Sequence, residues 1–152
     1  MITMSKYDCL KLENQLCFPL YACSKAITRH YKPFLDKYDL TYTQYITMMA
    51  MWEKKQASVK ELGECLYLDS GTLTPVINKL EKKGYISKHR SEDDARGVIV
   101  EITDTAKKLR DKMVDVPMMM GGCVNISEKD ATDLYRILYK ILGNLDDIDS
   151  KQ

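Results

Sequence analysis

The sequence lacks the features that mark membrane proteins, zinc proteins and C-x-x-C redox proteins. Its 152 residues contain no apolar run of the ~18 residues that a membrane-spanning helix needs. There are only two histidines, His30 and His89, and the five cysteines form no C-x-x-C pair. Because zinc sites are built mainly from such residues, we expect no metal site, and nothing in the sequence implies a cofactor.

The sequence also lacks a clear excess of charge of either sign. The 23 basic and 22 acidic residues leave a net charge of +1, so composition alone does not indicate a nucleic-acid-binding protein. The N-terminal stretch MITMSKYDCLKLEN carries early charges and lacks the apolar core of a secretory signal. We therefore expect a cytoplasmic protein without a membrane partner, in a reducing compartment where structural disulfides are rare.

The sequence contains enough apolar residues for the core of one compact domain. The hydrophobic fraction is 45%, and domains cluster near ~100–150 residues, so we expect a single domain over 1–152. Apolar residues recur every three or four positions from Leu12 to Phe34. This spacing predicts a first helix with one apolar face.

Two cysteines lie on this first helix in different positions. Cys23 stands in the middle of the apolar face, so we expect it in the core, as we do Cys65 on a later apolar stripe. Cys17 lies on the flank of that face. Pro19 is expected to remove one backbone hydrogen bond and to bend the helix just after Cys17.

Capping residues mark three helices in the middle of the chain. Side chains of serine, threonine and aspartate cap helix N-termini, and glycine often follows the C-terminus. An S-x-x-E pattern is a capping box. The capping residues are Thr41 or Thr43 for a helix over 41–52, Ser58 with Glu61 for the next, and Asp69 or Ser70 for a third that Gly84 ends.

Residues 86–102 change from helical to strand periodicity. YISKHR and GVIVEIT predict two short strands joined by the polar loop SEDDA. Two short helices, a turn and a β-hairpin form a winged helix-turn-helix. The predicted fold class is therefore mainly α with a small β-hairpin wing, a winged helix-turn-helix.

The end of the sequence predicts a surface for a second chain. A helix opens at Thr103 and is interrupted by Pro117, and Ser127 caps a last helix. Its apolar seam is wide for a helix that ends a small domain, which suggests burial against a partner chain in a homodimer. The seam consists of Leu134, Leu138, Ile141 and Leu145.

The second helix of a helix-turn-helix reads the DNA major groove. Its hydroxyl side chains can donate to phosphates or base edges, and lysines and arginines on helix and hairpin can reach phosphates or a narrow minor groove. The same pattern fits a polar helix face and a solvated hairpin, so the residues alone leave both readings open. The candidate DNA contacts are Ser70, Thr72, Thr74 and Lys79 on the helix and Lys88, Arg90 and Arg96 on the hairpin.

The stretch YLDSGTLTPVINKLEKKGYISKHRSEDDARGVIVEIT resembles the core of the MarR family of transcriptional regulators. Within it, DDARGVIVEIT is similar to the wing signature of that family. The stretches LENQLCF, HYKPFLDK and LTYTQY further resemble the organic-hydroperoxide-sensing, OhrR/SarZ-like branch. The resemblance extends over nearly the whole chain, from about Leu12 to Leu145.

The resemblance implies a cytosolic, dimeric redox-sensing repressor without a cofactor. It also implies N- and C-terminal dimerisation helices, over about 12–40 and 104–150, and a DNA-binding region over about 41–103. Reduced protein would bind a pseudo-palindromic operator in double-stranded DNA, and oxidation of Cys17 by an organic hydroperoxide would release it. Tyr31 and Tyr42 match the tyrosines that hydrogen-bond the thiol in the reduced state. The matching DNA-recognition positions are Asp69, Ser70, Thr72, Thr74 and Pro75 on the helix, and Asp94 and Arg96 on the wing.

Helix geometry places a condition on this sensor. Cys17 and Tyr31 are 14 residues apart on one predicted helix. At 1.5 Å per residue they are separated by about 21 Å and cannot touch. If they hydrogen-bond, Tyr31 must come from the partner subunit.

A second thiol is a candidate resolving group. Some relatives of this kind carry a second cysteine that captures the sulfenic acid as an intersubunit disulfide, and others use a low-molecular-weight thiol. Cys123 in MMMGGCVN fits the first mechanism if Gly121 and Gly122 let this segment bend toward the first helix. Cys9, near the N-terminus, is a weaker candidate. The sequence leaves both mechanisms open.

Two other functions remain alternatives. One is a MarR-type regulator that is gated by a small phenolic ligand, with Cys17 incidental. The other is a thiol-dependent peroxidase that uses Cys17 catalytically. The absence of a C-x-x-C pair and the complete DNA-binding head disfavour an enzyme.

Overall fold

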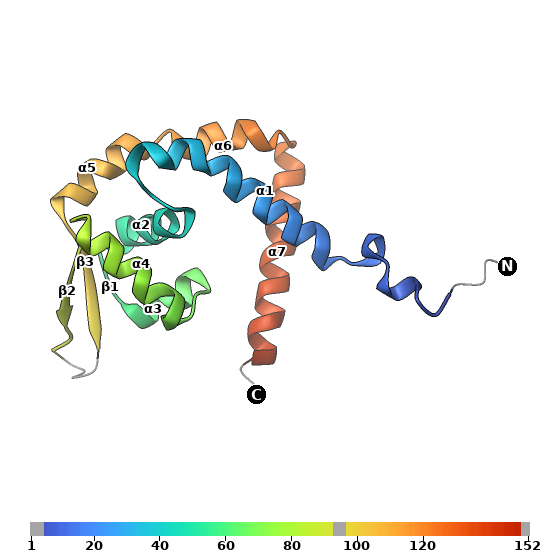
Figure 1. Ribbon diagram of the computed structural model, residues 1–152, viewed down its shortest axis with the longest axis horizontal. Coiled ribbons are helices and arrows are strands. Elements are labelled where there is room, and N and C mark those ends of the chain that lie inside the picture. Colours follow the sequence, from blue (N-terminus) through green and yellow to red (C-terminus); the bar gives the residue numbers. More distant parts are fainter. Residues whose placement is uncertain (1–4, 93–96, 150–152) are drawn as a thin grey trace. The chain divides into compact units, whose positions relative to one another are not determined.

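The computed structural model describes residues 5–92 and 97–149 (Figure 1). The chain forms two compact units, Met1–Met120 and Gly121–Gln152. The single domain over 1–152 and its division into dimerisation and DNA-binding regions stay predictions. Within the described ranges, no helix is both long enough and apolar enough to cross a membrane.

The first unit holds the helices and the sheet of the predicted winged helix-turn-helix. Helix α6 (Val116–Val124) continues from it into the second unit, which contains α7 (Glu128–Asp149). The elements of the first unit are η1 (Asp8–Leu10), η2 (Leu12–Asn14), α1 (Cys17–Leu35), η3 (Asp36–Tyr38), α2 (Tyr42–Lys54), β1 (Gln56–Ser58), α3 (Val59–Leu66), α4 (Ser70–Lys82), β2 (Ile86–Arg90), β3 (Val98–Ile102) and α5 (Asp104–Met113).

The predicted caps form and fix where the helices begin. Thr41, not Thr43, caps α2, and its Oγ1 accepts from the Gln44 N–H at 3.3 Å while Gln44 Oε1 accepts from the Thr41 N–H at 3.1 Å. Ser58 and Glu61 form the same reciprocal box at α3. Asp69 caps α4, and Gly84 follows its end with a φ of 74°. These local signals were readable because capping involves residues only three positions apart.

The sheet has three antiparallel strands in the order β1-β3-β2. The hairpin of β2 and β3 confirms the predicted wing. Strand β1 was missed, and it pairs Ala57 with Val100. Three residues are too few for a strand period to be visible in the sequence.

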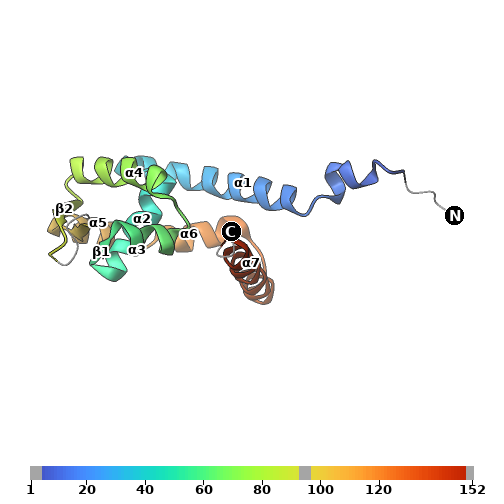
Figure 2. The same ribbon diagram turned by 90° about the horizontal axis from the view of Figure 1, so that it is seen from below.

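The core lies between α2, α3, α4 and the sheet. Met48, Leu62, Leu73 and Val100 are fully buried there. The one buried residue of α1 is Leu35, at its last turn, and Tyr31 and Phe34 pack against the core while partly buried. The N-terminal half of α1 projects beyond α2, α3, α4 and the sheet (Figures 1 and 2).

The expected burial of Cys23 and Cys65 is wrong, because both side chains are exposed. On the apolar face of α1 around Cys23, Ile27 is 38% exposed and Leu20 is only partly buried. In α3 only Leu62 is buried, so Cys65 lies outside a narrow stripe. Periodicity identified the apolar face of α1 but not which chain covers it.

Pro19 does not remove a helical hydrogen bond as predicted. Because η2 occupies Leu12–Asn14, α1 begins only at Cys17 and Pro19 is its third residue. The first turn of a helix has no intrahelical acceptors for its N–H groups, so proline loses nothing there.

The segment around Cys123 is helical and not the bending segment that its glycines suggested. Helix α6 passes through Gly121 and Gly122 and ends at Val124. The helix that opens at Thr103 ends at Met113, earlier than the predicted interruption at Pro117. Pro117 is instead the second residue of α6, where its missing N–H is tolerated.

Helix α7 presents its predicted apolar seam without cover. Ser127 caps it, with Oγ accepting from the Asp130 N–H at 3.1 Å. None of its described side chains is buried, and Leu134 and Leu145 are 46% and 51% exposed. An apolar seam of this length on a 22-residue helix fits a face that a second chain covers.

Candidate functional site

Three tyrosines from two helices form an aromatic cluster in the first unit. Tyr31 lies on α1, and Tyr42 is the first residue of α2, with 4.9 Å between their ring centroids. Tyr45 of α2 lies 5.7 Å from Tyr31 and 6.5 Å from Tyr42. Tyr45 is only 2% exposed, whereas the other two are partly buried. The structure therefore brings both predicted sensor tyrosines together.

Burial keeps these phenols neutral. It raises the pKa of Tyr31, Tyr42 and Tyr45, and the neighbouring Tyr42 raises that of Tyr31 further. The pKa of Tyr45 rises to about 12, mainly through burial and then through the two other phenols. A neutral phenol keeps its O–H and can donate a hydrogen bond to an anion such as a thiolate.

Tyr45 is the member of the cluster that the sequence analysis missed. It stands three residues after Tyr42 on the same helix, so the two side chains share one face. That spacing was a usable signal. The ring contact with Tyr31, from another helix, could not be read from the sequence.

Cys17 is the first residue of α1, and its thiol is exposed. It sits between two exposed apolar side chains, Leu16 and Phe18. A helix N-terminus offers unpaired N–H groups and a positive dipole end, which favour a nearby negative charge such as a thiolate. The surroundings of Cys17 are thus open to an apolar oxidant.

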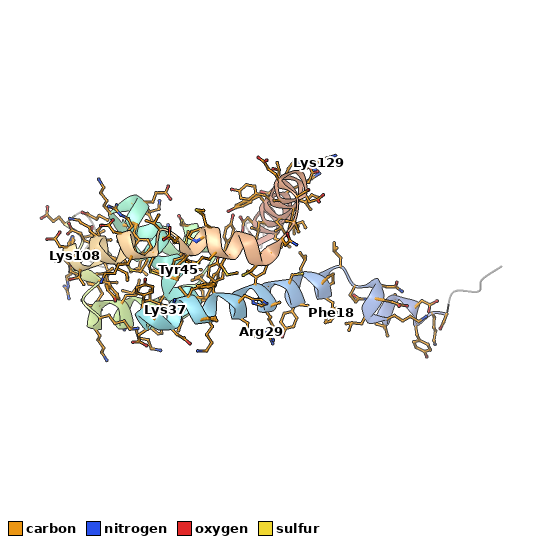
Figure 3. All side chains as sticks on the ribbon, turned by 90° about the horizontal axis from the view of Figure 1, so that it is seen from above. Phe18, Arg29, Lys37, Tyr45, Lys108 and Lys129 are labelled. Atoms are coloured by element: carbon orange, nitrogen blue, oxygen red, sulfur yellow. The ribbon has the colours of Figure 1, made fainter. Side chains whose placement is uncertain are left out.

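Cys17 does not meet the tyrosines of its own chain. One continuous helix joins Cys17 to Tyr31, so the separation of about 21 Å applies. Figure 3 shows Phe18 near the projecting end of α1 and Tyr45 by the other end. A site that contains both groups requires a second copy of the chain.

The predicted recognition helix α4 presents a polar face. Ser70, Thr74, Pro75 and Lys79 are exposed on it. Two of the predicted contacts serve the helix itself, because Asp69 accepts from the Thr72 N–H at 2.8 Å and from the Thr72 hydroxyl at 2.9 Å. These hydrogen bonds lower the pKa of Asp69.

The predicted wing contacts differ in their surroundings. Lys88 binds Glu81 Oε2 at 2.9 Å and Asn78 Oδ1 at 2.7 Å, which ties β2 to α4. Arg90 is exposed at the end of β2. Asp94 and Arg96 lie outside the described residues.

The other thiols are free and exposed. Cys123 lies in the last turn of α6, and Cys9 lies in η1, where its Sγ donates to the Lys6 carbonyl at 3.4 Å. Among the described residues, no group of three or more histidine, cysteine, aspartate or glutamate side chains is placed to hold a metal ion.

Known transcriptional regulators are similar to this chain over most of its length. Residues 29–113 match a family described as "Transcriptional regulator SarA/Rot". The organic hydroperoxide resistance transcriptional regulator of Bacillus subtilis (strain 168) is 45% identical over 141 residues, covering 93% of this chain and 96% of that protein. The HTH-type transcriptional regulator SarZ of Staphylococcus aureus (strain MRSA252) is 40% identical over 141 residues, covering 92% and 95%.

Solved structures are similar over the same length. The structure of reduced AbfR bound to DNA has a TM-score of 0.76 at 27% identity and covers 93% of this chain and 99% of that chain. The crystal structure of AbfR of Staphylococcus epidermidis has a TM-score of 0.73 at 29% identity, with 93% and 98% covered.

Proposed function

The chain belongs to the SarA/Rot and MarR-type winged-helix transcriptional regulators, and from this we propose that it is a redox-sensing repressor. In its reduced state it binds a pseudo-palindromic operator in double-stranded DNA. Oxidation of Cys17 by an organic hydroperoxide releases it.

One observation carries this proposal. In a chain that is 45% identical to a hydroperoxide resistance regulator, the exposed thiol of Cys17 lies at the start of α1, and the aromatic cluster of Tyr31, Tyr42 and Tyr45 lies by the other end of that helix. Phenols that donate to sulfur stabilise a thiolate without adding charge. The thiolate attacks the O–O bond of a hydroperoxide and becomes a sulfenic acid, while the alcohol leaves.

The protein acts as a homodimer in this proposal. The uncovered seam of α7 and the uncovered apolar face of α1 support it. In the dimer, Cys17 of one chain lies against Tyr31 and Tyr42 of the other. A sensor divided between two chains can change how their two DNA-reading heads are held.

DNA binding uses α4 in the major groove and the wing beside it. The exposed residues Ser70, Thr74, Pro75 and Lys79 support contacts from the helix, and Arg90 supports one from the wing. Asp69 and Thr72 fix the start of α4, and Lys88 fixes the wing against it. Asp94 and Arg96 complete the proposed wing contacts.

The protein is not an enzyme in this proposal, and it needs no cofactor. A regulator must reach chromosomal DNA, so we place it in the cytoplasm. Gating by a small phenolic ligand and peroxidase activity are less favoured, because the most informative relatives are regulators and one is named for organic hydroperoxide resistance.

The test combines intact mass with DNA binding. One equivalent of an organic hydroperoxide should add one oxygen or the mass of a captured thiol at Cys17, or yield the mass of a covalent dimer if Cys123 captures the sulfenic acid, and operator binding should weaken in the same sample. Loss of DNA binding without any change in mass would contradict thiol sensing. Continuous consumption of peroxide with a thiol reductant would point to the enzyme instead.

A further inference from the structure

Lys83 joins the recognition helix α4 to α2, the helix that carries Tyr42 and Tyr45 of the aromatic cluster. It follows the last residue of α4, and its backbone N–H donates to the Lys79 carbonyl at 3.1 Å. Its ammonium group donates to the backbone carbonyl of Asp39 and lies 2.9 Å from Asp39 Oδ2. It also lies 3.5 Å from Gln44 Oε1.

The acceptors of Lys83 belong to the start of α2. Asp39 turns the chain into α2 with a φ of 52°, and Gln44 is the residue of the capping box whose Oε1 also accepts from the Thr41 N–H. The same first turns of α2 carry Tyr42 and Tyr45. One lysine therefore contacts the segment that sets the position of two cluster phenols.

The contacts are sheltered enough to hold the two helices together. Gln44 is 3% exposed, and the Lys83 side chain is 24% exposed. The Asp39 carboxylate is almost fully exposed, so that ion pair alone contributes little. If the ammonium group of Lys83 is removed, the Asp39 carbonyl and the buried Gln44 amide oxygen each lose this hydrogen-bond donor.

We propose that Lys83 is a positioning residue that transmits the state of the tyrosine cluster to the recognition helix. This rests on the proposed redox function. A displacement of Tyr42 on oxidation moves the first turn of α2, and Lys83 carries that movement to the end of α4. Such coupling changes the ratio of DNA affinities between the two redox states, not the chemistry at Cys17.

The test compares Lys83→Met with Lys82→Met in the full-length dimer. Methionine keeps most of the length of the stem and removes the donor. Lys82 is the adjacent exposed lysine of α4, so its variant measures what losing one positive charge near DNA does. Three quantities are measured: the rate of Cys17 oxidation by an organic hydroperoxide, and the operator Kd of the reduced and of the oxidised protein.

Lys83→Met should oxidise at the wild-type rate, and its ratio of oxidised to reduced Kd should fall by about fivefold. Lys82→Met should change both Kd values alike and keep the wild-type ratio. Lys83→Arg, which restores a donor, should recover most of the ratio, and this rescue separates positioning from a general loss of stability.

Two results would overturn the proposal, and they are distinguishable. A ratio for Lys83→Met equal to or above that of the wild type, in a wild type that responds to oxidation, overturns the role of Lys83 alone. A wild type with equal Kd values in both states overturns the redox function and this coupling with it.

Discussion

The rings of Tyr31 and Tyr42 lie 4.9 Å apart, although one tyrosine comes from the end of α1 and the other from the start of α2. Their contact forms half of the proposed sensor within one chain. The other half, Cys17, lies at the far end of α1. The arrangement explains why two chains are needed before a thiol and its phenol donors can meet.

Cys17→Ser should bind operator DNA in the absence of oxidant and keep that affinity when an organic hydroperoxide is added. Serine has no sulfur to oxidise, so release is lost. The measurement is operator affinity before and after hydroperoxide treatment. Cys23→Ser is the matched control, because Cys23 is also exposed on α1. A lost response in Cys23→Ser, with a normal one in Cys17→Ser, would reverse the assignment.

Tyr45→Leu should slow oxidation of Cys17, whereas Tyr45→Phe should react at nearly the wild-type rate. The ring of Tyr45 packs on both sensor tyrosines, and aromatic pairs of this kind contribute about 0.5–1.5 kcal/mol. If the thiolate loses stabilisation of that size, the activation barrier for its oxidation rises by the same amount, and the reaction becomes roughly twofold to tenfold slower. Stopped-flow measurement of thiol loss provides the rate.

Tyr38→Leu is the control for this effect. Tyr38 packs against the same core, and its hydroxyl donates to the Lys112 carbonyl at 3.0 Å, away from the cluster. The Tyr38→Leu variant should destabilise the fold without slowing the oxidation of Cys17. Equal slowing in Tyr38→Leu and Tyr45→Leu would mean that the effect is one of stability alone.

Acid should weaken the cap of the recognition helix. The pKa of Asp69 in the folded chain is below its ordinary value of 3.8, because the Thr72 N–H and hydroxyl donate to the carboxylate. Ionised Asp69 therefore stabilises the fold above pH 3.8, and this contribution disappears as the pH falls through the lowered pKa. The Tm advantage of wild type over Asp69→Asn should shrink over that interval. A constant or growing difference would contradict this.

The sulfenic acid at Cys17 can be captured by Cys123 of the partner chain or by a small thiol, and a variant of Cys123 distinguishes the two. If Cys123 of the partner chain captures it, oxidised wild type runs as a covalent dimer on a non-reducing gel and Cys123→Ser runs as a monomer. The covalent dimer requires the two Cα atoms to approach within about 7 Å. Because α6 does not bend at Gly121 and Gly122, that approach depends on how the two chains pack. A peptide map with Cys17 joined only to a small thiol and Cys123 free would establish the one-cysteine mechanism.

Local signals predicted most of the fold, and contacts between distant elements account for what was missed. The caps at Thr41, Ser58 and Asp69 depend on neighbours three residues away, so the sequence reveals them. Strand β1 depends on a partner strand more than 40 positions later in the chain. The exposure of Cys23 depends on which elements pack against α1, which periodicity does not reveal.

For the proposed sensor, too, local motifs were visible in the sequence and contacts between helices were not. The motif around Cys17 and the two tyrosine motifs predict the sensor residues, and helix length predicts that Tyr31 comes from the partner subunit if it hydrogen-bonds Cys17. The contribution of Tyr45 and the link through Lys83 arise from side chains that meet across helices. Neither could be inferred from spacing along one element.

Mixed dimers test the division of the sensor between two chains most directly. In one dimer, a Cys17→Ser chain is paired with a Tyr31→Phe, Tyr42→Phe chain, so the remaining thiol faces intact tyrosines of its partner. In the other, a wild-type chain is paired with a chain that carries all three substitutions. The first dimer should react with organic hydroperoxide at the wild-type rate per thiol, and the second should react more slowly. The reverse order would contradict the account, because it would place each thiol with the tyrosines of its own chain.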